Sequence, residues 1–257
     1  MRSATRLVYL DAILFLVGGI VGTGHHWYFT GQGTLNMGLA ACFSAFEVVP
    51  LTLLTLDAAG FVHLRKRNQV ADGTDMASKQ KWAIYFLIAV GVWNFVGAGI
   101  LGFLITMPIV SYFEIGTTLT ANHSHAAMFG VFGMLALGVL VFAMRAMQSD
   151  EVWAGTEKLV KFGFWGLNVG LALMVLLDLF PAGVLQLWDV LTHGYWHARS
   201  LAFTMTGPFH VLEWMRIGGD LTFILFGAIP IVLATVRAYV KRDLRPAVDL
   251  QPTGAPR

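Results

Sequence analysis

Two pairs of histidines lie inside long apolar runs of this chain. His25 and His26 are adjacent, whereas one residue separates His123 from His125. Imidazole is a common metal ligand in proteins. Ionisable side chains are costly in an apolar environment, and inside membrane spans they usually serve a function. The four histidines are therefore candidate metal ligands.

The spacing of each pair predicts a different task. Successive residues of a helix turn by about 100°, so His123 and His125 point to nearly opposite sides and cannot easily share one metal. Each can instead hold a separate planar cofactor, because imidazole is a standard axial ligand of haem. His25 and His26 are about 100° apart, or closer if their glycine-rich helix end unwinds. This adjacent pair can converge on one non-haem metal.

Glu47 is a further ionisable residue in an apolar run. A carboxyl group in hydrocarbon is neutral or takes part in proton transfer. A short loop joins its helix to the helix of His25 and His26, so the two helices should be neighbours. A proton-carrying carboxyl beside a metal suits a reaction that consumes protons. The alternative is a structural hydrogen bond from Glu47 to a Ser or Thr of another helix.

Other polar residues of the apolar runs favour structural interpretations. Four histidines are expected at interfaces or in loops: His63, His193, His197 and His210. Four aspartates are explained by interfacial solvation: Asp11, Asp57, Asp178 and Asp220.

The composition predicts an integral membrane protein. Hydrophobic residues make up 56% of the chain and charged residues only 12%. A bilayer core needs about 20 apolar residues to be crossed as a helix, and lipid admits only helices for such runs. We expect an all-α fold with six transmembrane helices in one domain (1–242), followed by a disordered tail (243–257). The helices are expected at 7–29, 35–64, 82–107, 118–147, 160–180 and 211–240.

The basic residues predict the topology. All but two of the 17 Lys and Arg residues fall on one side of this arrangement, and only Arg199 and Arg216 fall on the other. The positive-inside rule then places both termini in the cytoplasm, and a bacterial inner membrane is the simplest location. Both histidine pairs would lie within roughly 10 Å of the outer boundary, where they could face one cavity. The amphipathic segment 181–208 is expected at the outer interface.

Cys42 is the only cysteine. This excludes disulfides, thiolate iron–sulfur clusters and the covalent attachment of c-type haem. Any metal must be held by histidine or carboxylate. A phosphate-binding loop, a nucleophile triad and a nucleic-acid-binding face are also absent from the sequence.

Four segments, in order and spacing, resemble the catalytic subunit of nitric oxide reductases in the haem–copper oxidase superfamily. A fifth segment, 195–203 (YWHARSLAF), is similar to the single-subunit, quinol-dependent branch, and the likeness extends over nearly all of residues 1–240. The four segments are 22–28 (GTGHHWY), 43–50 (FSAFEVVP), 93–103 (WNFVGAGILGF) and 119–130 (LTANHSHAAMFG).

The resemblance implies a role for each candidate residue. His25 and His26 would be two of three histidine ligands of a non-haem iron. His123 would be the proximal ligand of a high-spin haem b, and His125 an axial ligand of a low-spin haem b. Glu47 would correspond to the family's glutamate near the iron. The implied reaction takes 2 NO, two electrons from quinol or cytochrome c, and two protons to N2O and water.

The sequence departs from the family in length. It corresponds to the C-terminal half of the catalytic subunit, without the third iron histidine and the second low-spin haem ligand. We therefore expect little turnover unless the N-terminal half is supplied as a separate polypeptide. Three alternatives stay open: a fragment of an oxygen-reducing oxidase with copper in place of iron, an inactive truncated remnant, and a proton-coupled transporter.

Overall fold

The computed structural model describes residues 79–242 without interruption. Before them it describes residues 9, 12–13, 16–27, 30–46, 48–49 and 52–53, without the side chains of His25 and His26. Every regular element in these residues is helical. The N-terminal part contains the 3-10 helix η1 (Thr23–Trp27) and the helix α2 (Thr34–Phe46). The all-α expectation is confirmed for the described residues.

Four continuous helical rods in the described part are long and apolar enough to cross a membrane. They confirm the last four of the expected helices. The expected helices at 7–29 and 35–64 lie only partly within the described residues, and the tail 243–257 lies outside them, so the count of six stays a prediction. The rods are the first span (Lys81–Thr106), the second span (Thr118–Ala146), the third span (Asp150–His193) and the fourth span (Gly207–Val240).

Each span contains a π-helical segment between two α-helices. The first span consists of α5 (Lys81–Trp93), η2 (Asn94–Leu101) and α6 (Gly102–Thr106), and the second of α8 (Thr118–Ser124), η3 (His125–Gly133) and α9 (Met134–Ala146). The third consists of α10 (Asp150–Leu173), η4 (Met174–Leu179) and α11 (Phe180–His193), and the fourth of α13 (Gly207–Leu221), η6 (Thr222–Ala228) and α14 (Ile229–Val240).

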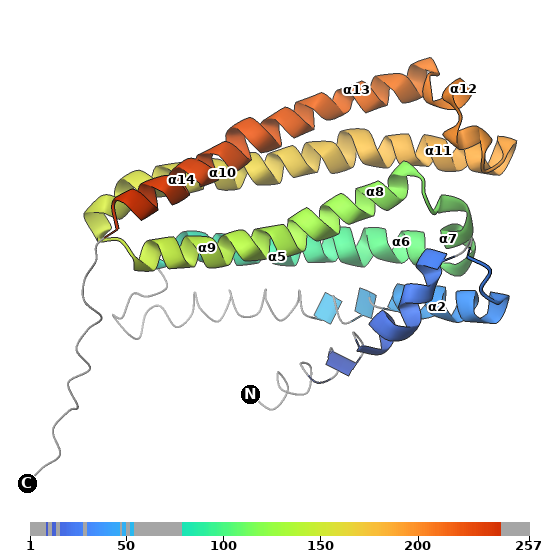
Figure 1. Ribbon diagram of the computed structural model, residues 1–257, viewed down its shortest axis with the longest axis horizontal. Helices are drawn as coiled ribbons and strands as arrows, with labels where there is room; N and C mark the ends of the chain where they lie inside the picture. Colours follow the sequence, from blue (N-terminus) through green and yellow to red (C-terminus); the bar gives the residue numbers. More distant parts are fainter. Residues whose placement is uncertain are drawn as a thin grey trace, which may run out of the picture.

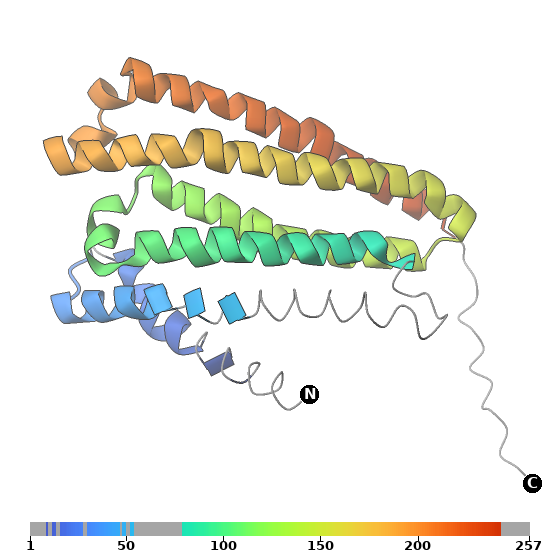
Figure 2. The same ribbon diagram turned by 180° about the vertical axis from the view of Figure 1, so that it is seen from behind.

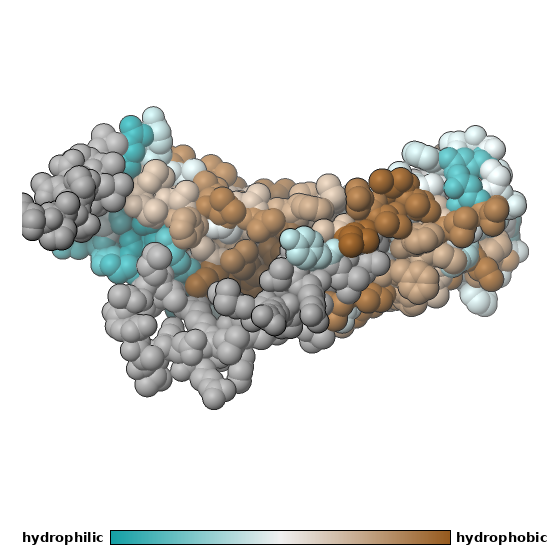
Figure 3. Space-filling view, turned by 90° about the horizontal axis from the view of Figure 1, so that it is seen from below, coloured by the Kyte–Doolittle hydropathy of each residue, from teal (hydrophilic) through white to brown (hydrophobic). Residues whose placement is uncertain are grey.

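The spans run side by side along the long axis of the molecule (Figures 1 and 2). Short elements join them at one end: α7 (Pro108–Glu114) before the second span, and η5 (His197–Arg199) and α12 (Leu201–Thr204) before the fourth. We call this end the cap. On the face seen in Figure 3, hydrophobic residues occupy the middle and hydrophilic residues gather at both ends, as in a multi-pass membrane protein.

The third span is longer than predicted. The sequence predicts a helix at 160–180 and an interfacial segment from Pro181, but the helix runs over 44 residues, Asp150–His193. At 1.5 Å per residue it is about 66 Å long, roughly twice the hydrocarbon thickness. Hydropathy located the apolar centre of this helix but not the more polar helical turns on either side of that centre. Pro181 does not end the helix: the irregular segment η4 directly precedes it, and such segments commonly accompany proline in a continuous helix.

Small residues bring the third and fourth spans together. Gly163, Gly166 and Gly170 lie one turn apart on α10, and a methyl group on any of them would overlap the fourth span. Helices in lipid gain little from burying apolar surface, so close backbone approach through small residues is their usual means of association. The glycine stripe therefore fixes this helix pair.

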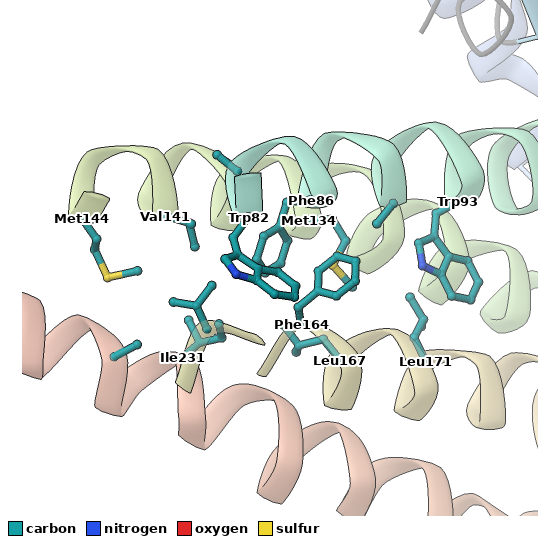
Figure 4. Packing of buried hydrophobic residues seen from close by; sticks show 14 of the residues in the cluster. Trp82, Phe86, Trp93, Met134, Val141, Met144, Phe164, Leu167, Leu171 and Ile231 are labelled. Carbon is teal, nitrogen blue, oxygen red and sulfur yellow. The ribbon is translucent and has the colours of Figure 1, made fainter. Parts of the chain in front are cut away.

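Aromatic side chains fill the space between the spans (Figure 4). Phe86 of α5 is fully buried and meets Phe164 of α10 edge to face, with ring centroids 5.1 Å apart. Two indoles also donate hydrogen bonds to α10: Trp82 Nε1 to Glu157 Oε1 at 2.8 Å, and Trp93 Nε1 to Asn168 Oδ1 at 2.9 Å. These bonds add direction to packing that is otherwise non-directional.

Candidate functional site

His123 lies in the last turn of α8 and contacts the first span. Its Nδ1 is 2.9 Å from the carbonyl oxygen of Gly97. A Cβ at Gly102 would lie 3.0 Å from the imidazole Cε1, so glycine is the residue that leaves room for the ring. The imidazole therefore packs between two glycine positions of the neighbouring helix.

His125 begins η3 and contacts the fourth span. Its Nδ1 is 2.8 Å from the carbonyl oxygen of Ala121 in its own helix, and its Nε2 is 3.2 Å from Nη2 of Arg216 in α13. The ring also lies 5.6 Å from the ring of Phe129. His123 and His125 thus contact different spans, as their two-residue spacing predicts. Their role as ligands stays a prediction.

The hydrogen bonds of both imidazoles suit coordination through Nε2. A carbonyl oxygen only accepts, so Nδ1 donates in each ring, and in the neutral imidazole Nε2 then has the lone pair. Metal-ligating histidines commonly show this arrangement, with the second nitrogen donating to a carbonyl. A metal on Nε2 of His125 would take the place of the Arg216 side chain. Arg216 also contacts Asp220, with 3.2 Å between Nε of Arg216 and Oδ2 of Asp220. The two imidazoles therefore fit the role of axial ligands to two separate haems.

Buried polar groups next to the histidines lack partners among the described residues. Asn122 of α8 and Asp178 of η4 are each 1% exposed, and neither side chain makes a hydrogen bond in that part of the chain. The interfacial solvation expected for Asp178 is wrong, because the third span continues past it and buries it. Unsatisfied buried groups are rare in complete sites. Described residues already enclose both side chains, so they are unsatisfied positions inside this part of the chain.

The cap holds the N-terminus of α8 in place. The carbonyl oxygen of Ile115 accepts hydrogen bonds from Tyr195 Oη at 2.8 Å and Arg199 Nη2 at 2.6 Å. The backbone N–H and Oγ1 of Thr118 both donate to Oε1 of Gln186, at 2.8 and 2.9 Å. The segment 195–203 thus positions the helix that carries His123.

Glu114 is a buried carboxyl group at the end of α7 in the cap. Its side chain is buried, and Thr120 Oγ1 donates a hydrogen bond to its Oε2 at 3.0 Å. Burial raises the pKa of this carboxyl from its ordinary 4.5 to about 7, although the Thr120 hydrogen bond and the charge of Arg199 act in the opposite direction. Glu114 therefore changes protonation near neutral pH.

The first histidine pair is described only by its backbone. His25 and His26 lie in the 3-10 helix η1, where successive residues turn by about 120°. The helix end is therefore tighter than an α-helix, and the unwinding that the sequence left open as an alternative does not occur. η1 packs on α2, which contacts α6 and α7, and Figure 1 shows η1 and α8 in the half of the molecule that contains the cap. Glu47 lies outside the described residues, and the shared cavity stays a prediction.

The glycines of segment 93–103 pack against a helix. A Cβ at Gly97 would lie 2.7 Å from backbone and side-chain atoms of Ala126 in η3, and one at Gly130 would lie 2.5 Å from Trp93. At Gly97 the neighbour is a helix.

The fold defines a multi-pass helical membrane protein in which one helix presents two imidazoles to different neighbours. Residues 2–222 match the family model described as Cytochrome C and Quinol oxidase polypeptide I. The chain belongs to this family of haem–copper oxidase catalytic subunits, which confirms the resemblance found in the sequence and implies haem and metal cofactors.

Among curated proteins, the chain is similar to a nitric oxide reductase subunit of Stutzerimonas stutzeri. The two are 31% identical over 183 residues, which cover 70% of this chain and 36% of that protein. The chain thus spans about a third of the length of this relative.

The structure also reveals a histidine group for which the sequence favours structural contacts. His193 and His197 both contact the carboxylate of Asp189 in the cap. Their spacing, D-x3-H-x3-H, is visible in the sequence. The sequence places these residues in segment 181–208, which it predicts only as amphipathic and interfacial. The spacing indicates a shared face only once α11 is known to continue to His193.

Proposed function

We propose that this chain is the C-terminal part of the catalytic subunit of a respiratory nitric oxide reductase, which reduces 2 NO to N2O and water. The similarity to the nitric oxide reductase of Stutzerimonas stutzeri supports the substrate. The observation that carries the proposal is the opposed pair in the second span: His123 and His125 each donate Nδ1–H to a carbonyl and face different helices.

Each histidine has a distinct role in this proposal. His123 would hold a high-spin haem b and His125 a low-spin haem b, while His25 and His26 would hold a non-haem iron. The metals, when bound, would bring two NO molecules together and polarise them. The chain's own contribution is position: the second span fixes the two haem ligands two residues apart, so electrons need to cross only a short stretch of one helix.

Proton supply is proposed for Glu47. The reaction consumes two protons, and a carboxyl in an apolar helix next to the metal ligands can carry them inward. Its position in segment 43–50, which resembles the corresponding segment of the family, supports this role.

The remaining ligands are expected on another polypeptide segment. The family's third iron histidine and second low-spin haem ligand have no counterpart in this chain, and the chain covers 36% of the related nitric oxide reductase subunit, which supports a further component that would pack against α8. We propose that the N-terminal half of the catalytic subunit packs there, and that quinol or cytochrome c donates the electrons.

The proposed location is the bacterial inner membrane with both termini in the cytoplasm. The charge distribution of the described residues supports this orientation, because Arg145, Lys158, Lys241 and Arg242 lie at or near span ends opposite the cap.

An oxygen-reducing oxidase with copper in place of the iron is the second candidate, because the matching family model is described by its oxidases. Glu47 and the similarity to a nitric oxide reductase favour NO. The family match lends no support to the transporter alternative.

The test is to purify the chain with and without the proteins encoded beside its gene. Haem content, the iron-to-copper ratio and NO consumption are then measured. We expect two haems b, iron without copper, and NO consumption only in the complete preparation. The result that sinks the proposal is the absence of haem from every preparation, which would indicate an inactive remnant; copper with oxygen consumption would establish the oxidase.

A further inference from the structure

A second histidine group lies in the cap, away from His123 and His125. Asp189 Oδ1 is 2.8 Å from Nδ1 of His193, and Asp189 Oδ2 is 2.7 Å from Nδ1 of His197. The two imidazole centroids are 5.1 Å apart. One ligand atom from each of the three residues lies within 4.8 Å of the others, an arrangement that the described residues show only here.

The chain reversal at the end of α11 brings the three side chains together. Asp189 and His193 are four residues apart on α11, so they share one face of the helix. Gly194 ends the helix with φ of 98°, a conformation that glycine adopts at little cost. The chain then turns back into η5, whose first residue is His197.

The three side chains differ in exposure in a way that suits a cation site. The Asp189 side chain is 8% exposed, whereas those of His193 and His197 are 62% and 43% exposed. A buried carboxylate thus supplies negative charge beneath two imidazoles that an ion can reach from water. Thr192 Oγ1, 3.0 Å from Nδ1 of His193, is the remaining polar neighbour of that nitrogen.

We infer that Asp189, His193 and His197 form a site for a divalent transition-metal ion of the Zn²⁺ type, with water as the fourth ligand. Two imidazoles and one carboxylate form a typical Zn²⁺ donor set, and they disfavour Mg²⁺ and Ca²⁺, which prefer oxygen ligands. Tetrahedral Zn²⁺ with bonds of about 2.0–2.2 Å separates its ligand atoms by roughly 3.3–3.5 Å. The N–O pairs, at 2.8 and 2.7 Å, therefore need to open by about 0.5–0.8 Å, a movement available to exposed imidazoles.

The site has a structural consequence for the cap. Ala198, which follows His197, accepts a hydrogen bond from Gln186 Nε2 at 2.8 Å, and Gln186 in turn holds Thr118 at the start of α8. A bound ion would tie η5 to α11 and so stiffen the support of α8. The inference does not depend on the proposed function.

The test is Zn²⁺ binding by the full-length chain, purified in detergent with a tag that contains no histidine. The protein is stripped with a chelator and dialysed against buffered free Zn²⁺, and bound zinc is counted by mass spectrometry separately from iron. The variants are His193→Ala and His197→Ala. His210→Ala is the matched control, because His210 is another imidazole at the cap end and pairs with Trp214 instead of a carboxylate.

We expect one Zn²⁺ per chain, an affinity at least about tenfold weaker in each of the first two variants, and an unchanged affinity in the control. Zn²⁺, but not Mg²⁺, should raise the midpoint of thermal unfolding. Equal zinc binding by the wild type and the His193→Ala/His197→Ala double variant would overturn the inference, as would no binding by the wild type at micromolar Zn²⁺. If the alanine variants unfold, His193→Gln and His197→Gln take their place.

Discussion

The histidine pair of the second span and the histidine pair of the cap differ in how their two side chains are arranged. In the second span, His123 and His125 are two residues apart in a continuous helix and contact different neighbours. In the cap, His193 and His197 are four residues apart across a chain reversal and share one carboxylate. Spacing in a helix separates the first pair, and a turn brings the second pair together. The first geometry suits two cofactors and the second suits one ion.

The largest expected effect is the difference in turnover between an alanine variant of the second-span pair and one of the cap pair. In the proposed complete reductase, His123→Ala should lower NO turnover by at least about a thousandfold, because the haem proposed at the reaction centre would lose its ligand. His193→Ala should leave turnover within about twofold. Both are measured with an NO electrode. Similar losses in the two variants would mean that the cap contributes to the reaction.

Replacement of Gly97 should disrupt the support of His123. In Gly97→Ala the new methyl group meets the backbone of Ala126 at 2.7 Å, and the carbonyl bonded to His123 must shift. We expect a loss of about 1–3 kcal/mol in unfolding free energy, followed by thermal or denaturant unfolding in detergent. Gly218→Ala is the control, because a Cβ there meets no atom within 4 Å. Equal stability of both variants would contradict the proposed packing.

The cap should show a pH dependence of stability that originates in Glu114. The pKa of Glu114, which lies outside the spans, rises from 4.5 to about 7 on folding, so the folded chain binds a proton more tightly than the unfolded chain. The free energy of unfolding should therefore fall as pH rises from about 4.5 to about 7, by at most about 3 kcal/mol.

Glu114→Gln should flatten this pH profile, because glutamine keeps an acceptor for Thr120 but does not ionise. The measurement is the thermal midpoint between pH 5 and 8 in both proteins. An identical slope in the variant would assign the pH dependence to another group.

The smallest effect is expected from removing the side-chain hydrogen bond at the N-terminus of α8 or of α12. The side chain of Thr117 accepts a hydrogen bond from the N–H of Leu119 at the start of α8, and the side chain of Ser200 accepts one from Phe203 at the start of α12. Thr117→Ala and Ser200→Ala should each lower stability by about 1 kcal/mol. Only Thr117→Ala should also shift the haem absorption bands of the proposed complete reductase, because α8 carries the proposed haem ligand His123. A shift in both variants would show that α12 acts on the same site.

Hydropathy located the apolar centre of each described span but not the ends of the third. The first and second spans end within a residue or two of their predicted limits, because charged or turn-forming residues follow the apolar run directly. The third span continues through Asp150–Lys161 and through Pro181, where polar residues remain helical outside the hydrocarbon. Polarity marks the edge of the membrane, and a helix need not end there.

The sequence alone determined the membrane class, the family and the opposed directions of His123 and His125, because these depend on composition and on the fixed turn of a helix. The tertiary structure decided which groups surround them. Gly97 and Arg216 are 26 and 91 residues away from their histidine partners, and only packing brings them within hydrogen-bonding distance. It also gathered Asp189, His193 and His197, because the reversal at Gly194 depends on a backbone conformation that hydrophobic periodicity does not report.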